Sequence, residues 1–266
     1  MFTNQQIDAA HQAVLENTGK GVKLAVLDTG IDWSHPVFEN LEAGNDIAFE
    51  ENASTVSSKN AVDPDPFGHG TAIASIIHRL APDASLGSIR VLSGDARSGC
   101  NIVHAGAKLG IRENYKILHC SFGSQLRARL PDFKTWIDAA YLKQVHVVGA
   151  TSNLSPTRTD YPSHFPSVIG LSGVSKSADY RIGFHPDRLV QFTLPVDGFV
   201  VAWRENAYRK VGGTSFAAPI MTALAAKLLE TWPEATPHEL KALLIHLAKR
   251  EIDLTEMLSS QGIIEN

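Results

Sequence analysis

The chain has 266 residues, of which 44% are hydrophobic, and it carries a formal net charge of -4. This apolar content is sufficient for a large buried core, and α/β chains of this length commonly form one domain. The negative charge argues against nucleic acid and against an anionic membrane surface as partners. We expect a single domain over residues 1–266, with a core at roughly 20–250 between an N-terminal helix and a C-terminal tail.

The cysteines and the N-terminal sequence bear on the cellular compartment. Two cysteines, Cys100 and Cys120, allow one bridge at most, and we expect both to be buried as reduced thiols. Residues 1–20 contain charged side chains and no apolar run long enough for an export signal, and no later segment is long enough to cross a bilayer. These features predict a cytoplasmic protein without a membrane partner.

Apolar strand patterns alternate with helical patterns over the first part of the chain. The helical patterns lie at 4–17, 69–80, 101–114 and 131–144, and the strand patterns lie at 22–28, 86–92, 117–122, 145–150 and 168–172. Strands that are apolar on both faces and separated by helices indicate a parallel sheet covered on both sides. Sites in such sheets lie at the carboxyl ends of the strands, where Asp28, Ser121 and Asn153 fall.

The pattern changes after residue 188. Residues 189–194 and 198–203 are predicted to be short antiparallel strands joined through the sequence PVDG at 195–198. Ser215 opens a helix at 216–231 that is apolar nearly all round and therefore buried.

The remaining segments are more polar. An amphipathic helix is predicted at 236–250, where Thr236 and Glu239 cap its first turn. Residues 251–266 show no strong period, and we expect them to pack loosely. Residues 50–66 are polar and interrupted by prolines, which predicts a surface loop.

Three short motifs contain an Asp, a His and a Ser in that order. Residues 26–30 read VLDTG, residues 67–72 read FGHGTA, and residues 212–219 read GGTSFAAP. A serine hydroxyl becomes an effective nucleophile when an imidazole takes its proton, and a carboxylate fixes the tautomer of that imidazole. We therefore predict that Asp28, His69 and Ser215 are catalytic. An aspartic protease would need a second Asp-Thr-Gly or Asp-Ser-Gly, and the sequence has none.

All three motifs resemble those of the subtilisin-like serine proteases, and the resemblance covers roughly residues 20–250. Residues 147–153, VVGATSN, resemble the strand that ends in the family's oxyanion-hole asparagine, which identifies Asn153 as the second oxyanion donor. The resemblance implies a three-layer, subtilisin-like α/β fold with a mostly parallel central sheet and helices on both faces. It also implies a serine endopeptidase that hydrolyses peptide bonds through an acyl-enzyme.

The resemblance further indicates which residues bind substrate. Apart from Asp160, these are Ser121, Phe122, Gly123, Gly99, Cys100, Ala150 and Thr151. Asp160 falls where the family has the floor of the pocket for the side chain preceding the scissile bond. A carboxylate there favours Arg or Lys, unless Arg158 or Arg181 neutralises it. Asp65 is expected to add negative charge to the neighbouring subsite.

The expected partner is a peptide or protein substrate, and the proposed chemistry requires no cofactor. The other histidines lack the paired spacing of a zinc site, whereas calcium, which is common in the family, stays open. One alternative function is a leader-processing or macrocyclising protease of ribosomal peptide maturation; hydrolysis is favoured because no lid insertion is evident to exclude water. Another is a catalytically silent binding module, against which the intact Asp28, His69, Asn153 and Ser215 argue.

Overall fold

The computed structural model of the chain describes residues 2–41, 43–52, 55–61, 64–153, 158–175 and 179–265. The helices are α1 (Asn4–Glu16), α2 (His69–Leu80), α3 (Cys100–Arg112), α4 (Leu130–Leu142), α5 (Thr214–Thr231), α6 (Pro237–Lys249) and α7 (Thr255–Ser260), with short 3-10 turns η1 (Pro36–Phe38) and η2 (Arg127–Arg129). The strands are β1 (Lys23–Asp28), β2 (Asp46–Asn52), β3 (Thr55–Asn60), β4 (Ser85–Arg90), β5 (Ile117–Cys120), β6 (His146–Ala150), β7 (Ile169–Val174), β8 (Gly183–Phe184), β9 (Phe192–Pro195), β10 (Phe199–Trp203) and β11 (Ala207–Val211).

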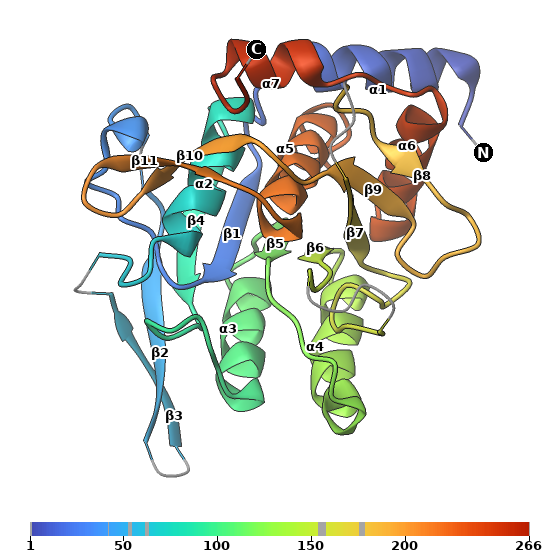
Figure 1. The fold of residues 1–266 in the computed structure, drawn as a ribbon. Helices are drawn as coiled ribbons and strands as arrows, with labels where there is room; N and C mark the ends of the chain where they lie inside the picture. Colours follow the sequence, from blue (N-terminus) through green and yellow to red (C-terminus); the bar gives the residue numbers. More distant parts are fainter. Residues whose placement is uncertain are drawn as a thin grey trace.

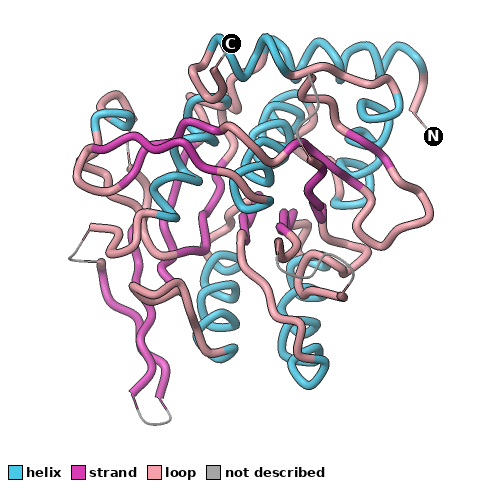
Figure 2. Tube along the Cα trace, viewed as in Figure 1, coloured by secondary structure: helices cyan, strands magenta, loops and turns pink. Residues whose placement is uncertain are grey.

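The described residues form a nine-stranded central sheet with the strand order β3-β2-β4-β1-β5-β6-β7-β9-β8. All neighbouring strands in it are parallel except β3, which is antiparallel to β2, and β8, which is antiparallel to β9. Helices α2, α5 and α6 lie on one side of the sheet, and α3 and α4 lie on the other (Figure 1). The predicted three-layer α/β architecture is confirmed, and Figure 2 shows the strands of the sheet between the two helical layers.

Strand β1 has apolar side chains on both faces of the sheet, and helices cover both faces. Its side chains alternate between two apolar clusters: Leu24 and Val26 pack with α2 and α5, while Ala25 and Leu27 pack with α3 and α4. Successive side chains of a strand point to opposite faces, so a strand that is apolar at every position must be buried on both. This burial fixes the carboxyl end of β1, where Asp28 lies, in the middle of the molecule.

The expectation of a surface loop at 50–66 was wrong for most of that segment. Residues 53, 54, 62 and 63 lie outside the described part of the chain, but β2 and β3 form an antiparallel hairpin with Ile47 to Asn52 opposite Asn60 to Thr55. Strand β3 lies at the edge of the sheet and is mostly exposed. An edge strand carries no alternation of apolar and polar residues when both its faces meet water, so its sequence resembles a loop.

The predicted pairing of residues 189–194 with 198–203 was also wrong. Strand β9 pairs parallel with β7, whereas β10 pairs antiparallel with β11 in a separate two-stranded sheet. Gly198, with a φ of 86°, redirects the chain between β9 and β10. The local sequence predicts that both segments are extended, but the partner of each strand depends on distant residues.

The C-terminal tail packs more tightly than we expected. Helix α7 forms within it, and Leu254, Leu258 and Ile263 are fully buried. Arg79 of α2 donates a hydrogen bond to the carbonyl oxygen of Gly262 (3.0 Å), which ties the tail to α2, and another to that of Val200 in β10 (2.6 Å). Irregularly spaced apolar residues anchor this segment, and irregular spacing produces no helical or strand period. Residue 266 lies outside the described part.

Candidate active site

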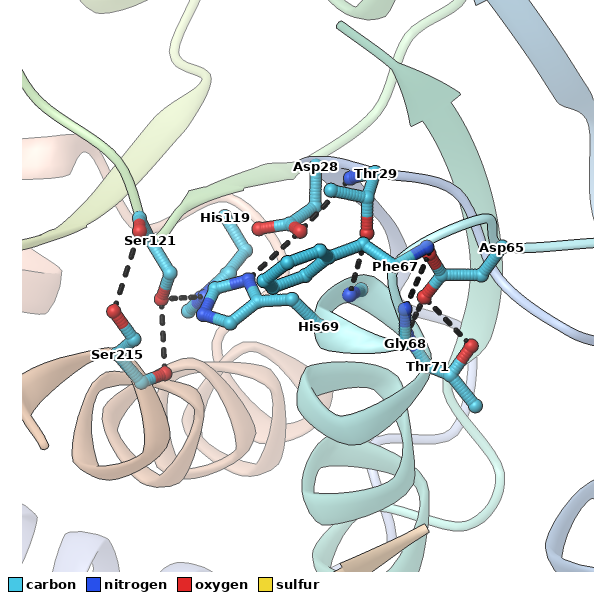
Figure 3. Close-up of polar contacts among 11 residues, drawn as sticks. Asp28, Thr29, Asp65, Phe67, Gly68, His69, Thr71, His119, Ser121 and Ser215 are labelled. Atoms are coloured by element: carbon cyan, nitrogen blue, oxygen red, sulfur yellow. Dashed lines mark hydrogen bonds and ion pairs between the residues drawn. The ribbon is translucent and has the colours of Figure 1, made fainter. Parts of the chain in front are cut away.

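The predicted catalytic residues lie together at the carboxyl ends of the central strands and at the starts of two helices beside them. Asp28 is the last residue of β1, His69 is the first residue of α2, and Ser215 is the second residue of α5. Figure 3 shows the His69 ring with one edge directed to the Asp28 carboxylate and the other edge on the side of Ser121 and Ser215. Residues 187 positions apart in sequence therefore share one site because two helices start beside the same strand ends.

Asp65 organises the turn that presents His69. Its carboxylate accepts hydrogen bonds from the backbone N–H groups of Phe67 (3.0 Å), Gly68 (2.8 Å) and Thr71 (2.9 Å), and from the Thr71 hydroxyl (2.9 Å). Asp65 is only 2% exposed. Both oxygens of Asp65 cap the N-terminus of α2. The expectation that its charge also acts on a neighbouring substrate subsite stays a prediction.

The glycine before His69 has a positive φ of 99° at the helix N-cap, where a side chain on Gly68 would also meet the Trp203 ring. The hydroxyl of Thr29 accepts a hydrogen bond from the Gly70 N–H (3.0 Å) and so joins the end of β1 to α2. These contacts hold the His69 ring beside Asp28.

The Asp28 carboxylate is fully buried and contacts His69 directly. Its Oδ1 accepts hydrogen bonds from His69 Nδ1 (2.8 Å) and from the Thr29 N–H (2.8 Å), while its Oδ2 has no partner among the described residues. Donation from Nδ1 leaves Nε2 of a neutral His69 as a proton acceptor. Burial would lower the pKa of His69, but the charge and hydrogen bond of Asp28, with the charge of Asp65, raise it.

Ser215 lies at the N-terminus of α5, where backbone N–H groups have no helical partner. Gly213 is the N-cap residue with a φ of 129°, and its N–H donates to the Val196 carbonyl (2.6 Å). The Ser215 hydroxyl donates to the carbonyl oxygen of Ser121 (3.4 Å). The His69 ring contacts the ring of Phe216, the next residue, edge to face at 5.4 Å between centroids. The imidazole therefore lies against the turn that carries Ser215.

Asn153 lies beside the same turn. Its Oδ1 accepts a hydrogen bond from the Thr214 N–H (2.9 Å), which orients the amide so that Nδ2 remains available as a donor. A Cβ on Gly213 would lie 2.9 Å from this Nδ2, so the position requires glycine. Thr214 also donates its hydroxyl proton to the Thr151 carbonyl (2.5 Å). These two hydrogen bonds hold the segment that carries Asn153 against the first turn of α5.

Asp160 lies beside the backbone of residues 121–124. Ser124 and Tyr161 form a two-hydrogen-bond antiparallel bridge (2.9 and 3.0 Å), and a Cβ on Gly123 would collide with the Asp160 carboxylate. Asp160 is 3% exposed. Burial raises the pKa of Asp160. A hydrogen bond with the Ser152 backbone and the charge of His164 lower it, but by less.

Neither arginine that we considered as an internal partner pairs with Asp160 in the described part of the chain. Arg181 pairs with Asp179 (3.3 Å) and Asp253 (3.2 Å), and Arg158 is exposed. Among the described residues, the buried Asp160 carboxylate beside residues 121–124 thus has no ion pair with Arg or Lys, and His164 is the positive neighbour that acts on it.

The other predicted substrate-binding residues fall into two groups. Ala150, Thr151, Ser121 and Phe122 follow the ends of β6 and β5 next to Ser215, whereas Gly99 and Cys100 begin α3 and lie near Glu51 of the β2–β3 hairpin. No described contact joins this second group to the catalytic residues. Both thiols are free: Cys120 is buried and Cys100 half-buried.

His119 and Thr222 were missed by the sequence analysis. His119 Nδ1 lies 2.7 Å from the Thr222 hydroxyl, and its Nε2 lies 2.8 Å from the Ser121 hydroxyl. Figure 3 shows the Ser121 hydroxyl in contact with both His119 and Ser215. A single histidine in an apolar strand gives no signal of these contacts, because buried histidines are common.

Among the described residues, no group of three or more His, Cys, Asp or Glu side chains is arranged to hold a metal ion. Within the same ranges, no helix has the length and apolar character needed to span a membrane.

Comparison with known proteins identifies the family to which this fold and this arrangement of residues belong. Residues 19–263 match the Subtilase family, and the chain belongs to that family. It is 29% identical over 242 residues to Subtilisin E of Bacillus subtilis (strain 168), covering 82% of this chain and 58% of that protein. It is 26% identical over 265 residues to the Major intracellular serine protease of the same organism, covering 92% of this chain and 81% of that protein.

Solved structures agree with this assignment. Sphericase is similar at a TM-score of 0.69 and 25% identity, covering 85% of this chain and 82% of that one. A cold adapted subtilisin-like serine proteinase has the same fold at a TM-score of 0.67. The predicted family and fold are therefore confirmed.

Proposed function

We propose that this chain is a serine endopeptidase in which Ser215 is the nucleophile, His69 the general base and Asp28 the carboxylate that orients His69. The observation that carries the proposal is the 2.8 Å contact of a buried carboxylate with His69 Nδ1, at a ring that packs against the turn bearing Ser215. This arrangement leaves His69 Nε2 to take the Ser215 proton. Membership of the Subtilase family supports it.

The reaction follows from these positions. Ser215 Oγ forms a bond to the substrate carbonyl carbon while its proton moves to His69 Nε2. The resulting oxyanion accepts hydrogen bonds from the Ser215 N–H at the α5 N-terminus and from Asn153 Nδ2. The C–N bond then breaks, and the leaving amine takes the proton from His69. Water attacks the acyl-enzyme by the same proton transfers in reverse, which releases the acid and restores Ser215.

The Ser215 hydroxyl donates to the Ser121 carbonyl in the unliganded structure. A modest rotation about the Ser215 side-chain bond is therefore part of the proposed mechanism, and long catalytic hydrogen bonds are common before substrate binds. The alternatives of leader processing, macrocyclisation and silent binding draw no support from a specific contact in the described residues.

Peptide hydrolysis tests the proposal. Internally quenched peptides with blocked termini report endopeptidase activity, and Ser215→Ala should lower kcat/KM by more than about a thousandfold because the nucleophile is lost. Ser260→Ala, at an exposed position of α7, is the matched control and should leave activity unchanged. Hydrolysis by Ser215→Ala at a rate close to that of the parent would contradict the proposal.

We also propose that Asp160 selects Arg or Lys before the scissile bond. Support comes from the buried Asp160 carboxylate beside Gly123, because no described Arg or Lys side chain forms an ion pair with it. A buried anion is costly, and an entering guanidinium or ammonium compensates it, with Arg able to contact both oxygens.

Matched peptides that differ only in Arg, Lys, Leu or Phe at this position test the selector. Wild type should prefer Arg and Lys, and Asp160→Asn should lower kcat/KM for these substrates by about 10- to 100-fold without loss on Leu. Asp138→Asn, on the exposed surface of α4, should keep the parent preference. A wild-type preference for Leu or Phe, or a basic preference that survives Asp160→Asn, would rule Asp160 out.

The proposal extends to the cellular location and the domain organisation. We place the protein in the cytoplasm and treat residues 1–266 as one peptidase domain acting on peptide or protein substrates; similarity to the Major intracellular serine protease supports the location. The proposed steps use only groups of this chain. Cell fractionation with an antibody to the protein tests the location.

A further inference from the structure

A buried chain of polar groups lies behind Ser215. The Ser121 hydroxyl donates to the Ser215 carbonyl oxygen at 3.0 Å, His119 Nε2 lies 2.8 Å from that hydroxyl, and His119 Nδ1 lies 2.7 Å from the Thr222 hydroxyl. His119 and Thr222 are both completely buried. We call these groups the His119 chain: Thr222, His119, Ser121 and the Ser215 carbonyl.

The hydrogen bond from the Ser121 hydroxyl to the Ser215 carbonyl sets the directions of the other two hydrogen bonds in the chain. Ser121 has one hydroxyl proton, and it is used on the Ser215 carbonyl, so His119 Nε2 must donate to Ser121. A neutral His119 then accepts at Nδ1 from the Thr222 hydroxyl. Burial, together with the charge of the nearby His69, lowers the pKa of His119 to about 3, so the imidazole is neutral at neutral pH.

The Ser215 carbonyl needs this partner. In a regular helix it would accept from the N–H of residue 219, but that residue is Pro219, which has no N–H. The Ser121 hydroxyl supplies the missing donor. Ser215 and Thr222 are two turns apart on α5. Ser121, which follows β5, contacts the helix at Ser215, and His119 of β5 contacts it two turns later at Thr222.

We propose that His119 is a positioning residue for the nucleophile. Its Nε2–H orients the Ser121 hydroxyl toward the Ser215 carbonyl, which holds the first turn of α5 and with it the Ser215 hydroxyl and N–H. This inference rests on the proposed function of Ser215. A histidine that only fills space would affect stability, whereas a positioning residue also affects the reactivity of Ser215 in the folded enzyme.

The rate of Ser215 labelling by a fluorophosphonate distinguishes these roles. His119→Phe keeps a ring of similar size but removes both nitrogens, and His146→Phe is the matched control. His146 is likewise buried and neutral but lies at the amino end of β6, away from the site. The second-order labelling constant is divided by the folded fraction from circular dichroism, and kcat and KM are measured on one peptide.

We expect His119→Phe to lower the labelling constant and kcat by about tenfold or more with KM within about twofold, because small displacements of a reacting group are costly. His119→Gln, which can still donate to Ser121, should recover part of the loss. His146→Phe should lower thermal stability only. A labelling constant for His119→Phe within about twofold of the parent, or an equal loss in His146→Phe, would overturn the inference.

Two milder variants cover the case in which His119→Phe does not fold. Thr222→Val removes the far donor, and Ser121→Ala removes the link to Ser215. Thr222→Val should slow labelling several-fold in the parent but not in the Ser121→Ala background, because the effect passes through Ser121. Equal effects in both backgrounds would overturn the inference. Absence of any Ser215 adduct in the parent would contradict the proposed function itself, and the inference with it.

Discussion

One oxygen of the buried Asp28 carboxylate carries both of its described hydrogen bonds, while Oδ2 has no partner among the described residues. A buried anion with an unpaired oxygen is poorly stabilised, so a positive charge that forms on His69 is favourable. Burial would lower the pKa of His69, yet Asp28 and Asp65 together raise it above its ordinary value of 6.5. The proposed general base is thus strengthened by its immediate neighbours.

The pH dependence of kcat/KM follows from this shift. The neutral imidazole is the active form, so kcat/KM should rise with pH through an apparent pKa above 6.5. Asp28→Asn should move this limb to lower pH, because the charge that raises the pKa is gone, and should lower kcat by about 10⁴-fold because the tautomer is no longer fixed. Initial rates between pH 5 and 9 measure both effects, and a flat wild-type profile would contradict the assignment of His69.

Asn153 gives a second prediction at the scale of single residues. If its Nδ2 binds the oxyanion, Asn153→Ala should lower kcat by about 10²- to 10³-fold with little change in KM, the loss that follows removal of the corresponding donor in a subtilisin. Asn40→Ala, at an exposed turn, is the control. Steady-state kinetics provide the measurement, and an Asn153→Ala enzyme with the parent kcat would exclude this role.

At the scale of elements, the start of α2 depends on a carboxylate from outside the helix. The N-cap Gly68 offers no side chain, and Asp65 instead accepts hydrogen bonds from three backbone N–H groups. Helix α6 shows the ordinary arrangement, in which Thr236 and Glu239 form a capping box at the surface. The two caps differ in burial and in their distance from the proposed catalytic histidine.

Asp65→Ala should therefore cost more than loss of the α6 cap. We expect a loss of about 2–4 kcal/mol in the free energy of unfolding, because buried N–H groups lose their acceptor, against about 1 kcal/mol for Thr236→Ala. Asp65→Ala should also lower kcat, since His69 begins the helix, while Thr236→Ala should not. Urea denaturation and initial rates provide the measurements. Equal stability losses in the two variants would show that the buried Asp65 cap stabilises the protein no more than the surface cap of α6 does.

At the scale of the whole molecule, the sequence predicts what depends on local pattern and on a small set of motifs. The buried strand β1 and the capped helix α6 have clear periods, and the residues of the proposed site stand in motifs whose resemblance to the Subtilase family is confirmed. The exposed strand β3 and the pairing of β10 with β11 could not be predicted, because edge strands lack alternation and pairing depends on distant residues. The contacts of His119 likewise arise only when α5 packs on β5.

Buried neutral histidines also predict how stability responds to acid. Burial lowers the pKa of His119 from 6.5 to about 3 and that of His146 to about 4. The folded state then binds fewer protons than the unfolded chain, so stability is retained above pH 6.5 and falls as the pH drops toward these values. The raised pKa of His69 acts in the opposite sense, since its contribution is present at low pH and is lost as the pH rises through it.

His146→Phe tests this response without touching the site. Between pH 6 and 4.5 the free energy of unfolding should fall less steeply in the variant, by about 1.4 kcal/mol per pH unit, because one group no longer resists protonation. Urea denaturation at several pH values measures the slope. Parallel curves for the variant and the parent would mean that His146 protonates in the folded protein as readily as in the unfolded chain.

The central claim is that Ser215 is an activated nucleophile, and covalent labelling tests it most directly. The native protein is treated with a fluorophosphonate at neutral pH, its intact mass is measured, and the adduct is located by peptide sequencing. We predict one adduct per chain, on Ser215, formed slowly at acidic pH and absent in Ser215→Ala and in denatured protein. An unmodified native protein, or an adduct on another residue, would contradict the account.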